Sequence, residues 1–396
     1  MANPIQVYEI VNSIAEQSLG MKNLTPTDTT FVSVGKAVFS SETNTDAFYK
    51  TLVDRIGRTT LALREYETDV VDMSLEPFVY GAMLQKLSFK LPKSQQNDTW
   101  LEQGSSSNPF EETTTEVMQV FFDKWETWEV PGTVPDVQLE TAFTSAQAMM
   151  AFIDGILMMM NEKMKLDYEN LGYLTRAALI ADVVNSSNSM TAINILAEYN
   201  AEMGTSLTMA KAIYDADFYR WAGMRMSMVS DQMVKYGVLF NKAKWNRHTP
   251  KDKQVLEMLT NFAKGFDVYL QSDVFHNELT KMPLFKKVPY WQSPGTDWSF
   301  DSVSSIDLGI ETYDYTTNTV TKANVTQSGI VAVIRDIDSC GITIDKRRTK
   351  SIYNPRREVT NYWLKADMGH FRDMSENCVV FYMADGSSAS LKTAKK

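Results

Sequence analysis

The side chains best suited to catalysis are few in this sequence, and their spacing forms no catalytic motif. There are three histidines and two cysteines in 396 residues. His276 has Asp273 and Glu278 beside it, a set that a metal-dependent hydrolase could use. No second histidine lies near, so a hydrogen-bonded helix histidine is the favoured interpretation. Cys340 precedes a glycine, and a small buried residue at a strand end explains it better than a nucleophile.

Two further patterns also favour structural explanations. Asp215 and Asp217 have the spacing of metal-ligating carboxylates, but acidic residues at a helix start interact favourably with the helix dipole. The 23 methionines fall mainly in helical segments, which favours core packing over a promiscuous binding surface. Cys340 and Cys378 show no metal-binding spacing and suggest a reducing compartment. The sequence therefore predicts no enzyme, no catalytic residue, no metal and no cofactor.

One basic run stands out in an acidic chain of formal net charge −10. Its cationic residues are Lys346, Arg347, Arg348, Lys350, Arg356 and Arg357. Three interpretations are open: a solvated turn, a contact to DNA phosphates, or a contact to an acidic partner. The chain offers such a partner in a polar segment rich in carboxylates, namely Asp98, Glu102, Glu111, Glu112 and Glu116. We favour the acidic partner, because we expect neither segment to settle inside one subunit.

Length and composition limit the protein class. A chain of 396 residues exceeds the size of one hydrophobic core, so we expect two or more lobes. The acidic balance argues against a dedicated nucleic-acid binder. We find no secretory signal at the N-terminus and no apolar run long enough to cross a membrane.

The elements that position these residues follow from hydrophobic periodicity. Two strands, 68–91 and 114–130, flank the polar segment 94–115 and predict a long hairpin that needs a surface to lie on. Apolar residues at helical spacing predict a long helix from residue 144 or 145 to 184. We predict further helices at 4–19, 45–57, 191–200, 206–237 and 249–266. We predict strands at 329–337, 359–365 and 377–383.

The order of these elements resembles the fold of the major capsid proteins of tailed bacteriophages, which encapsulins and the herpesvirus capsid floor share. Several stretches also look like capsid proteins of siphophage-type genomes. They are 141–145 (TAFTS), 167–171 (DYENL), 272–279 (SDVFHNEL), 288–292 (VPYWQ), 353–357 (YNPRR) and 377–382 (NCVVFY). The ordered set carries the resemblance, which covers most of the chain.

The resemblance implies an α+β fold of named parts. They are an N-terminal arm (1–62), an extended E-loop hairpin (63–132), a P-domain with its spine helix (133–190), a mixed A-domain (191–320), P-domain strands (321–384) and a C-terminal tail (385–396). It also implies a structural shell protein whose copies form the pentamers and hexamers of an icosahedral capsid around packaged double-stranded DNA. The expected place is the virion capsid, after assembly in the bacterial host cytoplasm.

The expected partners are other copies of the chain, a portal protein, and separate scaffolding and decoration proteins. The DNA is enclosed without sequence-specific binding, and no membrane is involved. Some relatives cross-link a lysine of this hairpin to an asparagine of a neighbouring copy. Lys86, Lys90 and Lys93 lie in the corresponding element, but nothing in the sequence identifies the partner asparagine or an activating glutamate. Two alternatives are an encapsulin-like compartment and the hydrolase considered above.

Overall fold

The computed structural model describes residues 73, 84–91, 110, 116–122, 125–136, 146–186, 188–269, 285–314, 317 and 319–385. The predicted helices 4–19 and 45–57, and with them the arm, lie outside these residues. The described chain divides into two compact units. One, the long-strand unit, includes Lys124–Leu171 and Ile342–Gly369. The other, the five-stranded unit, includes Gly81–Asp123, Gly172–Gly341 and the residues that follow Gly369.

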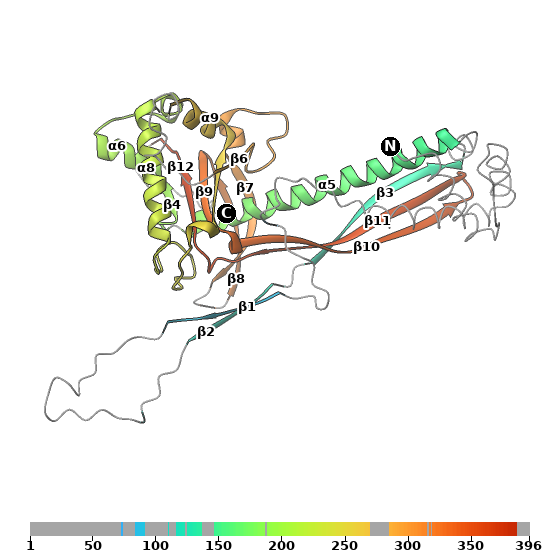
Figure 1. Ribbon diagram of the computed structural model, residues 1–396, viewed down its shortest axis with the longest axis horizontal. Coiled ribbons are helices and arrows are strands. Elements are labelled where there is room, and N and C mark those ends of the chain that lie inside the picture. The colour runs from blue at the N-terminus through green and yellow to red at the C-terminus, as the bar shows by residue number, and fades with distance from the viewer. Residues whose placement is uncertain are drawn as a thin grey trace. The chain divides into compact units, whose positions relative to one another are not determined.

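A mixed sheet of order β4-β12-β9-β5-β6 forms the core of the five-stranded unit (Figure 1). Its strands are β4 (Ala192–Asn194), β5 (Gln254–Leu259), β6 (Phe285–Val288), β9 (Ile330–Asp336) and β12 (Cys378–Tyr382). All seven residues of β9 are buried, because the strand is central and both of its faces are covered. The predicted strands 329–337 and 377–383 are thereby confirmed as β9 and β12.

Helices and short hairpins complete the five-stranded unit. They are α6 (Ile195–Met203), α7 (Met209–Ala212), α8 (Ala216–Met233), α9 (Thr260–Tyr269), α10 (Phe300–Val303), β1 (Leu84–Phe89), β2 (Val117–Phe122), β7 (Ile306–Asp314) and β8 (Thr319–Gln327). Asp215 caps α8 by accepting a hydrogen bond from the Phe218 amide at 2.8 Å, and Asp217 lies in the first turn. This confirms the structural interpretation of the two aspartates. Cys340 is buried at the start of a strand, as predicted.

A buried ionic group lies in the core of this unit. Glu257 on β5 accepts from Arg176 at 3.0 Å and from Arg335 on β9 at 3.4 Å, and all three side chains are at most 1% exposed. Burial alone would raise the pKa of Glu257, but the two guanidinium groups outweigh it and hold this pKa at about 2. The carboxylate therefore stays charged and compensates for part of the buried positive charge.

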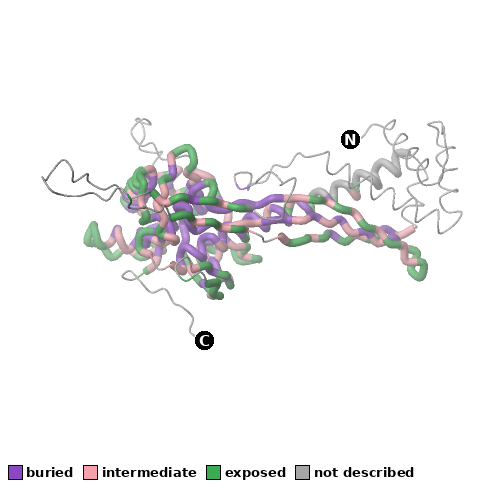
Figure 2. Tube along the Cα trace, turned by 90° about the horizontal axis from the view of Figure 1, so that it is seen from below, coloured by how far each residue is buried: buried purple, intermediate pink, exposed green. Residues whose placement is uncertain are grey.

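Three long strands and a long helix build the other unit. They are β3 (Trp125–Pro135), α5 (Ala146–Asn185), β10 (Cys340–Asn354) and β11 (Val359–Arg372). The last residues of α5, the first of β10 and the last of β11 belong to the five-stranded unit. The sheet order is β10-β11-β3, with β11 and β3 antiparallel and Leu364 opposite Val130. Buried residues alternate with half-buried ones along β11. Figure 2 shows buried residues in purple and half-buried residues in pink along the long strands. One face of this sheet is therefore covered and the other is more open.

The structure confirms the predicted long helix as α5 and the strand 359–365 within β11. The predicted helix 249–266 is wrong in its first half, which forms the 3-10 turn Lys251–Lys253 and β5 before α9 begins at Thr260. Thr249 does not cap a helix, because its hydroxyl donates to Asp336 at 2.8 Å. The apolar run of β5 lies between β9 and β6, and a strand covered on both faces has no alternation to distinguish it from a helix.

The prediction of one strand at 114–130 is also wrong, because β2 ends at Phe122 and β3 begins at Trp125 in a different sheet. The strands β7, β8 and β10 were not predicted individually. Among the described residues, no helix is long and apolar enough to cross a membrane.

Candidate functional site

The hairpin β1–β2 has one exposed apolar face. The strands β1 and β2 lie side by side (Figure 1). Their antiparallel register places Phe89 opposite Val117 and Gln85 opposite Phe121. Paired residues share a face, and Leu87 belongs to the same face by alternation. The exposed fractions of the four apolar residues lie between 52% and 65%. A strand pair that leaves such a row uncovered is typical of an interaction surface.

Ion pairs fix the opposite face of the hairpin to the rest of the five-stranded unit. The Lys86 amino group lies 2.5 Å from a carboxylate oxygen of Asp373 and 2.7 Å from one of Glu376. The guanidinium of Arg247 lies 3.1 Å from the same oxygen of Glu376 and also donates to the hydroxyl of Ser88. We call these residues the hairpin anchor: Lys86, Ser88, Arg247, Asp373 and Glu376.

The hairpin anchor is largely withdrawn from solvent. The side chain of Lys86 is 25% exposed, that of Glu376 10% and that of Asp373 0%. Burial lowers the pKa of Lys86, but the carboxylates of Asp373 and Glu376 outweigh it and raise this pKa above its ordinary value. Lys86 is therefore a charged group held in place. The rings of Phe122 and Phe371, with centroids 5.0 Å apart, add an apolar contact.

Most of the predicted basic run lies on a strand. Residues 346–354 belong to β10, along which exposed and half-buried residues alternate. Lys346, Arg348 and Lys350 lie on the exposed side, whereas Arg347 is half-buried. Arg348 donates to Asp367 of β11 at 2.6 Å, and Thr127 of β3 donates to the same oxygen at 2.7 Å. Part of the basic charge is therefore used within the sheet.

The remaining basic residues lie in the turn between β10 and β11. Arg356 and Arg357 are exposed, and their side chains have no partner among the residues that the structure describes. The Asn354 side chain accepts from the Arg356 amide at 3.2 Å, and Glu358 has a positive φ of 51°. The chain thus reverses tightly and presents two arginines to solvent. The solvated-turn interpretation fits these two residues, and because both are exposed they are also accessible to the surface of a partner.

The structure describes only one of the five predicted acidic contacts. Glu116 pairs with Lys90 across the hairpin at 2.6 Å. Asp98, Glu102, Glu111 and Glu112, together with Lys93, lie outside the described residues. The same holds for Asp273, His276 and Glu278, and the described part of the chain contains no group of three or more side chains fit to bind a metal. Sequence reasoning missed the hairpin anchor, since no pattern links Lys86 to the distant Asp373.

Comparison with known proteins gives a family and a fold. The family model described as Phi29-like phage major capsid protein matches residues 11–382. A chain of the structure of the head fiber and inner core protein of native bacteriophage P68 aligns with a TM-score of 0.51 and 8% identity, over 79% of this chain and 83% of that chain. At this identity the likeness shows the fold alone.

Two other solved structures are similar at lower scores. A chain of the capsid structure of Staphylococcus phage Andhra aligns with a TM-score of 0.49 and 8% identity, over 79% of this chain and 83% of that one. A chain of Gordonia phage Cozz aligns with a TM-score of 0.40 and 15% identity, over 81% and 88%. No curated protein sequence matches the chain.

Proposed function

The chain belongs to the Phi29-like phage major capsid protein family, and from this premise we propose that its copies form the pentamers and hexamers of an icosahedral shell around double-stranded DNA. The protein is a structural subunit of a phage capsid, and its copies associate with one another in the shell. An encapsulin-like compartment would use comparable surfaces and differ in its contents, and the family match is to a phage capsid.

The hairpin carries this proposal. Its inner face is held by buried ion pairs, whereas Leu87, Phe89, Val117 and Phe121 leave the outer face apolar and exposed. Covering the apolar row would stabilise an assembly, since burial contributes about 25 cal/mol per Å² of apolar surface. In a shell of identical subunits the surface that covers it belongs to a neighbouring copy.

The turn between β10 and β11 supplies a second contact in this proposal. Arg356 and Arg357 are the basic residues best placed to meet the acidic hairpin segment of another copy, because both are exposed and unpaired among the described residues. Arg347 and Arg348 suit a test less well, since Arg348 already pairs with Asp367. Contacts of this kind steer association and fix orientation more than they add affinity.

Charge exchange tests the second contact. We expect Arg356→Glu with Arg357→Glu to lower the yield of closed shells, as seen by negative-stain electron microscopy and sedimentation. Reversing Glu111 and Glu112 to lysine should lower the yield as well, and combining both pairs should restore it. The control variant, Lys235→Glu with Lys244→Glu, changes the charge equally at exposed positions outside both segments. A combined variant that assembles no better than either pair alone would remove this contact.

The other expectations stay proposals. We propose a portal protein, separate scaffolding and decoration proteins, assembly in the bacterial host cytoplasm, and DNA enclosed without sequence-specific contacts. The acidic net charge of −10 supports weak contact with the genome, because tight phosphate binding would oppose packaging and ejection. The predicted division into arm, E-loop, P-domain and A-domain stays a prediction too. The contents of particles from infected cells separate the two alternatives: a capsid would hold nucleic acid, whereas a compartment would hold an enzyme.

A further inference from the structure

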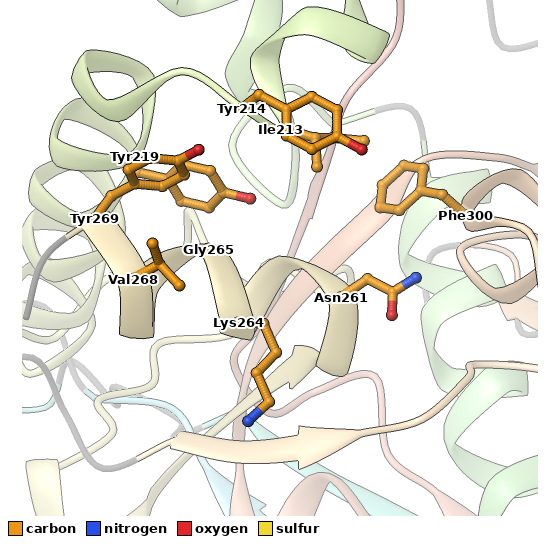
Figure 3. A pocket seen from close by; sticks show the side chains of 9 residues that line it. All are labelled: Ile213, Tyr214, Tyr219, Asn261, Lys264, Gly265, Val268, Tyr269 and Phe300. Carbon is orange, nitrogen blue, oxygen red and sulfur yellow. The ribbon is translucent and has the colours of Figure 1, made fainter.

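An aromatic pocket opens in the five-stranded unit, where the connection from α7 to α8 meets α9 and α10 (Figure 3). Its volume is about 420 Å³. Four rings line it, from Tyr214, Tyr219, Tyr269 and Phe300. The rings of Tyr219 and Tyr269 stack, with centroids 5.4 Å apart. Figure 3 shows Tyr214 and Phe300 across the pocket from this stack.

The chemistry of these walls suits a cation on an aliphatic stem. Aromatic faces carry negative potential and attract ammonium groups, and several rings around one space strengthen the effect. Tyr219 itself is fully buried, so its ring supports the wall from beneath, and the ring of the stack that a ligand can meet is the half-buried Tyr269. Lys264 lines the pocket, but its amino group points away from the rings toward Asp267, 3.9 Å distant. Val268, which is 59% exposed, adds an apolar rim.

The chain after β12 leaves the structure close to this pocket. The Ala384 amide donates to the Asn194 side chain at 3.3 Å, and the Ala384 carbonyl accepts from the same side chain at 3.2 Å. Asp385 then accepts from the amide of Met209 at 2.7 Å. Met209 is the first residue of α7, and Tyr214 in the pocket wall follows that helix directly. The last described residue is thus bonded to Met209, which precedes Tyr214 of the pocket wall by five residues.

The remaining eleven residues, 386–396 (GSSASLKTAKK), contain an apolar residue next to a lysine at Leu391 and Lys392. Lys392 follows Asp385 by seven residues, which span up to about 25 Å when extended. From Met209 to Tyr214 the chain advances by only about 8 Å at helical spacing. The lysine therefore reaches the pocket within one subunit.

We propose that the tail of each copy docks in its own aromatic pocket, with the Lys392 ammonium against the rings of Tyr214 and Tyr269 and Leu391 against the rim at Val268. This contact fixes a basic segment to the surface of an acidic subunit. It does not depend on shell formation, so its failure would leave the proposed function untouched.

Site-specific photo-cross-linking in the full chain tests the docking. The chain carries p-benzoylphenylalanine in place of Val268, or in place of Tyr236 as a control, since Tyr236 is 61% exposed and lies outside the pocket. We expect mass spectrometry to find tail residues linked to position 268 and none linked to position 236. Lys392→Ala should lower the yield at position 268 about two- to fivefold, the range that follows from an exposed cation–π contact. The matched change Lys395→Ala should leave the yield unchanged.

A mixture of ¹⁴N-labelled and ¹⁵N-labelled copies identifies the donor of the tail. Links within one label support docking in the same copy, whereas mixed-label links would overturn it in favour of a neighbouring copy. Tail links that are equal at positions 268 and 236, or a yield equally insensitive to Lys392→Ala and Lys395→Ala, would also overturn the proposal. Tyr214→Ala, at a residue 76% exposed and hence dispensable for folding, should lower the yield as Lys392→Ala does.

Discussion

Replacing Lys86 by methionine should release the hairpin from the rest of the five-stranded unit. Methionine keeps most of the side-chain length but removes the charge that faces Asp373 and Glu376. Removing one partner of a buried ion pair costs about 3–5 kcal/mol, because the other charge stays buried without compensation. Lys86 is one-quarter exposed and Arg247 still neutralises Glu376, so we expect about 2–3 kcal/mol for this anchor.

Hydrogen exchange measures this loss where it occurs. When the free energy of a local opening falls by about 2 kcal/mol, the amides that it exposes exchange about 30 times faster. We expect this acceleration in the amides of β1 and β2 of the unassembled chain, while the amides of the central strand β9 change little. Lys90→Met is the control, because its partner Glu116 is 66% exposed and such surface pairs contribute about 0–1 kcal/mol.

The comparison of amide exchange between Lys86→Met and Lys90→Met tests whether the anchor holds the hairpin. If exchange in β1 and β2 is the same for Lys86→Met as for Lys90→Met, the hairpin is not held by this anchor. Equal acceleration in β9 would show general destabilisation instead of a released hairpin.

Two further predictions concern the five-stranded unit, and a third substitution, in the part of α5 that belongs to the long-strand unit, serves as a comparison. Glu257→Gln should lower the free energy of unfolding by about 3–5 kcal/mol in urea at neutral pH, because two buried arginines lose their counter-charge. The folded pKa of Glu257, about 2, lies below the unfolded value of 4.5, so its stabilisation is complete above pH 4.5 and is lost as the pH falls toward 2; the variant should lack this part of the acid dependence. Gly265→Ala should lower the unfolding free energy by about 1–3 kcal/mol, since a Cβ there would lie 2.1 Å from the ring of Tyr219. Gly155→Ala in α5, with nothing within 4 Å, should instead stabilise the helix by about 0.5–1 kcal/mol, and equal thermal shifts in the two variants would contradict the packing argument.

Local patterns predicted the elements whose residues repeat at one period. The helix expected from residue 144 or 145 to 184 agrees with α5, because its apolar spacing depends only on neighbours in the sequence. Likewise β9 and β12 are short apolar runs rich in β-branched residues. The same reasoning failed at β5, where Leu256, Met258 and Leu259 suit a helix and a covered strand equally. Only the position of β5 between two strands excludes the helix.

The basic run shows a second limit of local reasoning. Exposed and half-buried residues alternate along β10, which is typical of a strand. In the sequence the cations of this segment are interpreted as a run of charge, and the strand period is not recognised. That Arg348 is paired follows from Asp367 on the next strand, and no spacing within 345–357 contains that information. Conversely, Arg356 and Arg357 lie in a turn, where proline and asparagine do favour a reversal of the chain.

The sequence by itself determined the class of this protein. The order of its elements and stretches indicated a capsid subunit of mixed α and β structure, and its composition and motifs pointed away from catalysis. The tertiary structure decided which face of the hairpin is held and which is exposed, and it placed Lys86 against Asp373 and Asp385 against Met209, the first residue of the helix before the aromatic pocket. The physical reason is the range of the interactions: helical and strand periods involve adjacent residues, whereas ion pairs and pockets join segments that only folding brings together.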